Sequence, residues 1–308
     1  MFKALTFLGR YASYTLPVGV LFGLLLPQLS SFLKPLLLPA LLIPLTLSLV
    51  RIHSNELKRS FSNWRLIIVL NLWSLIICPA LVWLALQPFD IPEAITMAAI
   101  IAASAPPITA CAAIATFLRI DAAISVVIAV TTMLVVPISF PFILELLVGL
   151  QVEVQLWLLS FRLCSFIFGA FALALVLKKW LGEKRIEHLS PTLDGISVIS
   201  IGIFNIVIMN GVTALFLSQP GFVMQTLIVS SLVVMGLYLV SATVFWRYQG
   251  ASKAMAIGLS SGNCNLGLMY IVLENQAPIE LLIYFAIGQI PLYFLPTLLA
   301  PSVSKLLK

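Results

Sequence analysis

The sequence predicts an all-α membrane protein, in which ten transmembrane helices form two inverted five-helix repeats. Hydrophobic residues make up 61% of the chain and charged residues only 9%, and the mean hydropathy is +1.13. A soluble domain carries about 25% charged residues, so the outer surface of this protein as well as its interior must be apolar. Two runs of small and polar residues, 104–111 (SAPPITAC) and 258–265 (GLSSGNCN), interrupt apolar segments at matching places in the two halves.

Segments long enough to cross a bilayer occupy nearly the whole chain, because each crossing needs roughly 20 apolar residues. In order, we expect transmembrane helices at residues 11–27, 32–50, 65–86, 91–117, 122–147, 155–179, 193–217, 222–246, 251–273 and 278–302. The first is expected to be a retained helix rather than a signal peptide, because no clear small-residue cleavage motif follows it. The connections are short and contain no linker, so we expect no separate catalytic or nucleic-acid-binding domain.

Basic residues predict the orientation, because Lys and Arg in short loops are retained on the cytoplasmic side of a membrane. With ten helices, all 17 basic residues except Lys34 and Arg162 fall on one side. We therefore expect a multi-pass protein of the cytoplasmic membrane with both termini in the cytoplasm. The four cysteines lie inside the expected helices without metal-ligand spacing, so we expect neither a disulfide framework nor a metal centre.

The two repeats are expected at residues 1–150 and 151–308, which together form a single integral membrane unit. Placing Ser104 on Ser260 brings the fourth helix over the ninth and the fifth approximately over the tenth. Five is an odd number, so two similarly folded halves must enter the membrane from opposite sides, as in many secondary transporters. The alternative is a chance coincidence of two breaks, because Pro and Gly are common in transmembrane helices.

The two interruptions are expected to be helix breaks that line one substrate cavity. Each unpaired backbone group in hydrocarbon costs several kcal/mol, so irregular backbone is tolerated where protein, water or a ligand satisfies it. Pro106 and Pro107 lack an N–H group, and Gly258 and Gly262 provide flexible backbone. The half-helices after the breaks would present N–H groups to an anion, and those before them carbonyl groups to a cation. The side chains expected to contact the substrate are those of Thr109, Cys111, Ser260, Asn263, Cys264 and Asn265.

At these residues the chain resembles the bile acid:sodium symporter family. Residues 106–137 (PPITACAAIATFLRIDAAISVVIAVTTMLVVP) are similar to the family's segment PGGxxSNxxTxLAxGDxxLSVxxTxxS, and residues 258–273 (GLSSGNCNLGLMYIVL) to its ExGxQN segment. The matching residues are Pro106, Asp121, Ser125, Val126, Gly262 and Asn265. The resemblance implies ten helices in an inverted repeat, a core domain whose fourth and ninth helices cross, and a panel domain of the first, second, sixth and seventh. It also implies transport of organic anions with sodium.

The chain departs from the family pattern at residues that matter for sodium. The family's Ser-Asn pair falls on Cys111 and Ala112, its Glu on Ser260 and its Gln on Cys264. Through this correspondence Ala112 joins the expected substrate site. Sodium is a hard cation that prefers oxygen ligands, and thiols replace such ligands poorly. We therefore expect sodium coupling to be weak or lost, with Ser125, Ser260 and Asn265 as the remaining candidates for a sodium site.

Polar residues in neighbouring helices are candidates to line the same cavity. In the family architecture Thr132 and Gln289 lie in helices that adjoin the crossing helices, and Asn205 and Asn210 belong to the panel. The alternative for each is a hydrogen bond between helices, which contributes about 1 kcal/mol. All acidic residues and both histidines are expected in loops or near helix ends, so no intramembrane proton relay is predicted.

Arg119 and Asp121 are expected in a tight cytoplasmic turn after the fourth helix. One interpretation is an ion pair that holds the crossing region or gates it. The alternative is a topology-setting arginine beside an aspartate that caps the N-terminus of the next helix.

These patterns predict a secondary transporter that moves a small organic solute, expected to be an organic anion, by alternating access. The alternative is a membrane receptor or scaffold that keeps the transporter fold without turnover, since fold alone does not establish function. An enzyme is not expected, because the chain has neither an HExxH motif nor paired intramembrane carboxylates. The expected partners are a small-molecule substrate and the lipid bilayer, with no nucleic acid and no cofactor apart from a sodium ion. The patterns leave the oligomeric state open.

Overall fold

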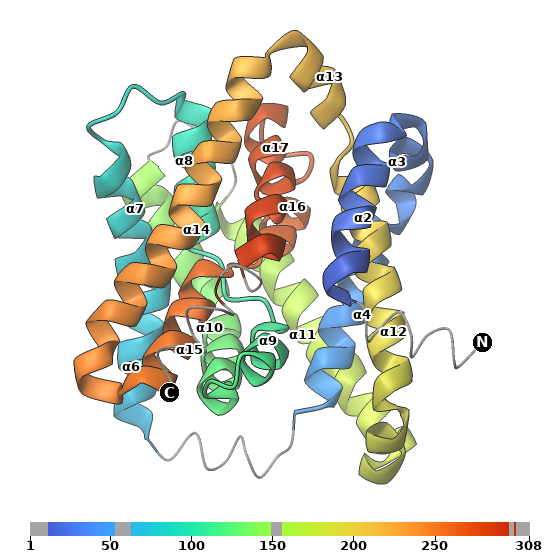
Figure 1. The fold of residues 1–308 in the computed structure, drawn as a ribbon. Helices are drawn as coiled ribbons and strands as arrows, with labels where there is room; N and C mark the ends of the chain where they lie inside the picture. Colours follow the sequence, from blue (N-terminus) through green and yellow to red (C-terminus); the bar gives the residue numbers. More distant parts are fainter. Residues whose placement is uncertain (1–11, 53–62, 149–155, 296–298, 300–308) are drawn as a thin grey trace. The chain divides into compact units, whose positions relative to one another are not determined.

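Helices make up almost all of the described chain (Figure 1). The computed structural model describes residues 12–52, 63–148, 156–295 and 299. Within these residues, the helices long and apolar enough to cross a membrane are Pro27–Val50, Trp64–Leu86, Ala122–Leu147, Trp157–Leu181, Glu183–Ser218 and Pro220–Gln249. The predicted all-α architecture of a membrane-embedded protein is therefore confirmed at this level.

The remaining expected crossings correspond to shorter helices. The first falls on α2 (Ala12–Leu25), and the tenth begins with α17 (Ile279–Ile287). The fourth is divided into α8 (Glu93–Ala103) and α9 (Cys111–Phe117), and the ninth into α15 (Ala251–Gly262) and α16 (Leu266–Leu273). A single helix needs about 20 residues to cross the bilayer, so a total of ten crossings stays a prediction.

The chain forms two compact units, each built from two separate stretches of sequence. Unit 1 comprises residues 1–52 and 164–224, and unit 2 comprises residues 53–163 and 225–308. The helices α11 (Leu156–Leu181) and α14 (Pro220–Gln249) each run from one unit into the other. Each unit therefore combines residues from both predicted repeats, 1–150 and 151–308.

In unit 1, α12 (Glu183–Ile208) packs along both α2 and α4 (Leu37–Val50). The short helix α3 (Pro27–Leu33) lies between α2 and α4 in sequence, and α13 (Val212–Ser218) follows α12. Two glycines allow α2 to approach α12 closely: a Cβ at Gly19 would lie 2.9 Å from the Gly202 oxygen, and one at Gly23 would lie 2.7 Å from the Ile206 oxygen. Small residues four apart are a common means of close packing between membrane helices.

The start of α12 differs from the expectation. The helix begins at Glu183 rather than near residue 193, so His188 is helical instead of lying in a loop. Asp194, expected near the end of a helix, lies inside α12 and forms an ion pair with Arg51. At the start of the helix, Lys178 Nζ lies 3.2 Å from Glu183 Oε1. The charged extension of the helix thus starts at a residue, Glu183, whose side chain is paired, and hydropathy alone does not reveal this extension.

Unit 2 contains the two divided helices together with α6 (Trp64–Leu72), α7 (Cys78–Leu86) and α10 (Ala122–Ile143). A π-helical turn, Trp73–Ile77, joins α6 to α7. Pro79 has no N–H group to donate within the helix. The Cys78 N–H donates to the Trp73 oxygen, five residues back, which is the hydrogen bond of a π-helix. The long helix α10 packs against α6, α9 and α15, and α8 packs against α7 and α17.

The second break is narrower than residues 258–265, because α15 remains helical through Gly262. Gly258 and Gly262 pack against α14 instead of unwinding. A Cβ at Gly258 would lie 2.6 Å from the Tyr238 oxygen, and one at Gly262 would lie 2.6 Å from the Val234 oxygen. Only Asn263, Cys264 and Asn265 separate α15 from α16. The first break, in contrast, leaves residues 104–110 outside regular α-helix, close to the expected 104–111.

Replacing Gly262 with alanine should destabilise unit 2, because the new methyl group would meet backbone of α14 rather than a flexible side chain. We expect a loss of about 1–3 kcal/mol, typical of overpacking, seen as a lower melting temperature in detergent. Gly236→Ala is the matched control: a Cβ at Gly236 in α14 meets nothing within 4 Å, so this change should be neutral or stabilising. Equal melting temperatures for the two variants would contradict the close contact between α14 and α15.

Candidate functional site

The two helix breaks of unit 2 contact each other directly. Pro107 and Cys264 form an antiparallel β-bridge. The Ile108 N–H donates to the Asn263 oxygen at 2.9 Å, and the Asn265 N–H donates to the Pro106 oxygen at 2.8 Å. The expected crossing of the fourth and ninth helices is therefore a pair of short extended segments that hydrogen-bond to one another. We call residues 104–110 and 263–265 the crossing.

These hydrogen bonds satisfy backbone groups that the breaks release. An unpaired N–H or C=O group in hydrocarbon costs several kcal/mol, so broken helices at membrane depth need partners. Pro106 and Pro107 supply no donors, and the Pro106 oxygen receives its donor from the other break. Each break thus supplies one N–H donor and one carbonyl acceptor to the other. Neither extended segment would be equally stable without these two hydrogen bonds.

The N-termini of the two half-helices are partly occupied by local partners. The Asn265 side-chain oxygen accepts from the Leu268 N–H at 3.0 Å, which caps α16. At the start of α9, the Cys111 N–H donates to the Ile108 oxygen at 3.0 Å. Asn265, expected to contact the substrate or sodium, therefore has an observed role as an N-cap residue. The sequence contains this signal, because Asn is a preferred capping residue and an apolar helix follows it.

Most of the expected site residues are buried. Eight of them are buried: Cys111, Thr132, Asn205, Ser260, Asn263, Cys264, Asn265 and Gln289. Thr109, Ala112 and Asn210 are half-buried. The crossing brings the residues of the two breaks together, and Ser125 and Thr132 lie on α10, which packs against α9 and α15. Asn205 and Asn210 belong to unit 1, whereas the other candidates belong to unit 2.

Some buried side-chain atoms near the breaks have hydrogen-bond partners and others do not. Ser260 Oγ donates to the Ala256 oxygen at 2.9 Å, and Asn263 Nδ2 donates to the Leu259 oxygen at 3.1 Å. Among the described residues, Ser125 Oγ, Ser261 Oγ and Asn263 Oδ1 have no hydrogen-bond partner. Buried polar atoms are normally paired, so these oxygens are suited to water, a ligand donor or a cation. Ser261 lies in the same polar run as Ser260 but was not among the expected substrate contacts.

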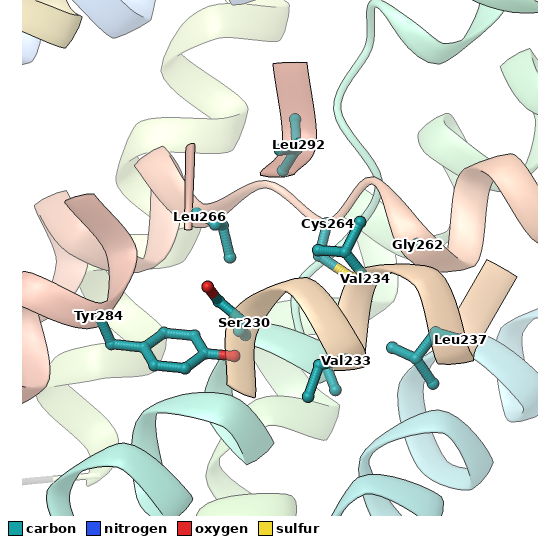
Figure 2. A pocket seen from close by; sticks show the side chains of 11 residues that line it. Ser230, Val233, Val234, Leu237, Gly262, Cys264, Leu266, Tyr284 and Leu292 are labelled. Atoms are coloured by element: carbon teal, nitrogen blue, oxygen red, sulfur yellow. The ribbon is translucent and has the colours of Figure 1, made fainter. Parts of the chain in front are cut away.

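A small cavity lies beside the crossing in unit 2 (Figure 2). Its volume is about 10 Å³, and aliphatic side chains form most of its wall, with Cys264 and the residues Ser230 and Tyr284 completing it. That volume holds about one water molecule, whereas pockets for organic ligands measure roughly 300–1,000 Å³. This cavity is therefore too small for an organic solute, and the substrate cavity stays a prediction.

The π-helical turn brings a further polar contact that the sequence does not reveal. Trp73 Nε1 donates to Ser241 Oγ at 2.8 Å, and the Trp73 ring packs edge-on against Phe245 with centroids 5.2 Å apart. Both contacts join this turn to α14 inside unit 2. A tryptophan buried in hydrocarbon needs a partner for its N–H group, and this one finds it in the serine.

The run GLSSG, residues 258–262, matches the G-x-S-x-G pattern of serine hydrolases. That motif functions where a sharp strand-to-helix turn exposes the serine. Here all five residues lie within α15, and Ser260 is 1% exposed with its hydroxyl bonded to the preceding turn. Ser260 therefore lacks the exposed position on a strand-to-helix turn that this motif requires.

Arg119 and Asp121 occupy the turn between α9 and α10. Asp121 Oδ1 accepts from the Ile124 N–H at 3.0 Å and so caps α10. Arg119 is exposed and has a φ of 59°, a left-handed conformation that ends the preceding helix. The ion pairs found among the described residues are Arg51–Asp194 and Lys178–Glu183, without Arg119 and Asp121. The capping interpretation therefore has an observed contact, and a gating role stays a prediction.

No family model matches the chain, and the search of curated proteins found no match. The resemblance to the bile acid:sodium symporter family therefore rests on residues 106–137 and 258–273 and on the hydrophobic pattern along the chain.

Replacing Asp121 with alanine should destabilise the protein by about 1 kcal/mol, the usual cost of losing an N-cap, and Asp121→Asn should retain most of the stability. Arg119→Ala should have little effect, because Arg119 is exposed and unpaired among the described residues. Melting temperatures of the single and double variants form the measurement. A coupling energy between the two positions as large as the effect of Asp121→Ala would instead indicate an ion pair.

Proposed function

We propose that this protein is a secondary transporter of a small organic solute, with an organic anion as the expected class. It lies in the cytoplasmic membrane with both termini in the cytoplasm, crosses it ten times, and is built from two inverted five-helix repeats. The single observation that carries the proposal is the crossing: two broken helices, one from each half of the sequence, meet through backbone hydrogen bonds. Discontinuous helices of this kind typically form the substrate site of secondary transporters.

The composition of the two units supports the same proposal. Unit 1 contains the expected first, second and seventh helices and most of the sixth. These are the helices assigned to the panel, and unit 2 contains both broken helices, as the core should. Transport by such a protein would require one unit to move relative to the other during the cycle.

The residues of the crossing argue against strong sodium coupling. A sodium site needs several oxygen ligands, and a carboxylate contributes both charge and oxygen atoms. Ser260 and Cys264 replace the acidic and amide residues of the family pattern, and Asn265 Oδ1 already caps α16. Of the proposed sodium ligands, Ser125 alone has a buried hydroxyl with no partner among the described residues. We therefore propose a carrier that depends weakly on sodium or not at all.

A second candidate function is a receptor or scaffold that binds a solute without moving it. The tight packing at the crossing and at the adjoining start of α9 favours this candidate, because the side chains of Asn263 and Cys111 are fully buried. Counterflow separates the two candidates, since a receptor binds solute but does not exchange it.

In proteoliposomes, the protein should exchange a labelled organic anion on one side for unlabelled anion on the other. A monocarboxylate, a dicarboxylate and a steroid carboxylate serve as probes. Ile108→Pro removes the N–H that donates to the Asn263 oxygen and should abolish exchange, whereas Ile108→Val keeps that bond and should retain it. Binding of a probe without exchange by the folded wild-type protein would favour the receptor.

Replacing sodium with potassium or choline at constant ionic strength should change the affinity for a transported anion less than about tenfold, a coupling below roughly 1.4 kcal/mol. The physical reason is the missing carboxylate at the crossing. Titrations of binding in the three salts provide the measurement. A larger sodium enhancement that disappears in Ser125→Ala would show that a functional sodium site persists.

A further inference from the structure

The helix α16 is too short to be stable on its own. It contains 8 residues, and isolated helices shorter than roughly 12–15 residues are marginal in water. Its N-terminus begins at the crossing, where Asn265 caps it and donates its own N–H to the Pro106 oxygen. We therefore expect contacts at the C-terminal end of α16 to affect the stability of the crossing as well.

Arg162 holds that end. From α11, its Nη1 donates to the Val272 oxygen at 3.2 Å and to the Glu274 oxygen at 3.1 Å. The last carbonyl groups of a helix lack partners within the helix and carry partial negative charge, so a guanidinium is well suited to them. The Gln276 side-chain oxygen also accepts from this guanidinium. It lies 2.9 Å from Arg162 Nη1 and 3.2 Å from Arg162 Nε when the amide is oriented to pair both its oxygen and its nitrogen.

The turn after α16 is shaped around this contact. Asn275 has a φ of 64°, a left-handed conformation that asparagine tolerates better than most residues. The Gln276 N–H donates to the Leu273 oxygen at 2.9 Å, and the Ala277 N–H donates to the same oxygen at 3.1 Å. The tight turn leaves the Val272 and Glu274 oxygens to the guanidinium. A lysine has no planar fork with which to reach several acceptors together.

The distribution of charge is an independent sign that Arg162 has a specific role. In the ten-helix topology it is one of two basic residues on the side that the other basic residues avoid. An arginine there opposes the usual bias of basic residues toward the cytoplasm. The charge bias of the membrane does not explain an arginine at this position, whereas its hydrogen bonds at the end of α16 do.

We propose that Arg162 is a positioning residue for the crossing: by anchoring the end of α16 to α11, it stabilises the β-bridge between Pro107 and Cys264. The eight residues of α16 form a rigid connection between the guanidinium at one end and the Asn265 cap at the other. Because α11 continues into unit 1 at Cys164, the same contact links the crossing to a helix shared by both units. The inference does not depend on whether the protein transports a solute.

Amide hydrogen exchange of the full-length protein in detergent tests this inference. In Arg162→Gln, amides of residues 265–273 and the Ile108 amide should exchange at least about tenfold faster, the scale expected for loss of hydrogen bonds to a charged group. Amides of α12 in unit 1 should be unchanged. Arg162→Lys should restore protection only in part, and Gln276→Leu should accelerate exchange at the same amides to a smaller extent.

Arg247→Gln is the matched control, because Arg247 is an exposed arginine of unit 2. It should leave every one of these amides unchanged. Faster exchange confined to residues 274–277 would overturn the proposal, since Arg162 would then secure only the turn. An equal acceleration in α12 and α16 would also overturn it, because it would indicate a general loss of stability rather than a specific hold on the crossing.

Discussion

The fold of unit 2 depends on the need to pair every backbone polar group within a membrane. Two helices that stop halfway would each leave donors and acceptors exposed to hydrocarbon. The pair of hydrogen bonds between residues 106–108 and 263–265 removes much of that penalty. Because the partners come from segments far apart in the sequence, these hydrogen bonds form only when the fold brings the two breaks together. The two prolines thus interrupt the first helix, and the second break supplies hydrogen-bond partners for the backbone groups left unpaired there.

Around this crossing, close approach of helices depends on small residues. Gly258 and Gly262 allow the backbone of α15 to contact that of α14. In unit 1, Gly19 and Gly23 allow the same contact between α2 and α12. Lipid tails are as apolar as leucine, so the hydrophobic effect contributes little to such contacts. Van der Waals contact and a few buried hydrogen bonds, such as that between Trp73 and Ser241, must hold the helices together instead.

Composition and hydropathy were sufficient to predict the helical membrane architecture, and Pro106 and Pro107 marked the first break almost to the residue. The second break was predicted too wide, because glycine serves both unwinding and close packing, and sequence alone does not separate the two. Hydropathy also missed the early start of α12, since a charged stretch can be helical, and here its first residue, Glu183, pairs with Lys178 of α11. At the site, the sequence identified the residues that meet. The sequence also holds the capping signal of Asn265, an asparagine directly before an apolar helix, but that residue was expected to contact the substrate or sodium instead.

Most of the connections between the two units are helical. Of the three points at which the chain passes from one unit to the other, two lie inside α11 and α14 rather than in loops. A helix resists bending, because every residue contributes to a continuous ladder of hydrogen bonds, and sharp kinks need a proline, a π-bulge or a similar cause. At residues 163–164 and 224–225 the chain therefore passes from one unit to the other through continuous helix, without a flexible linker.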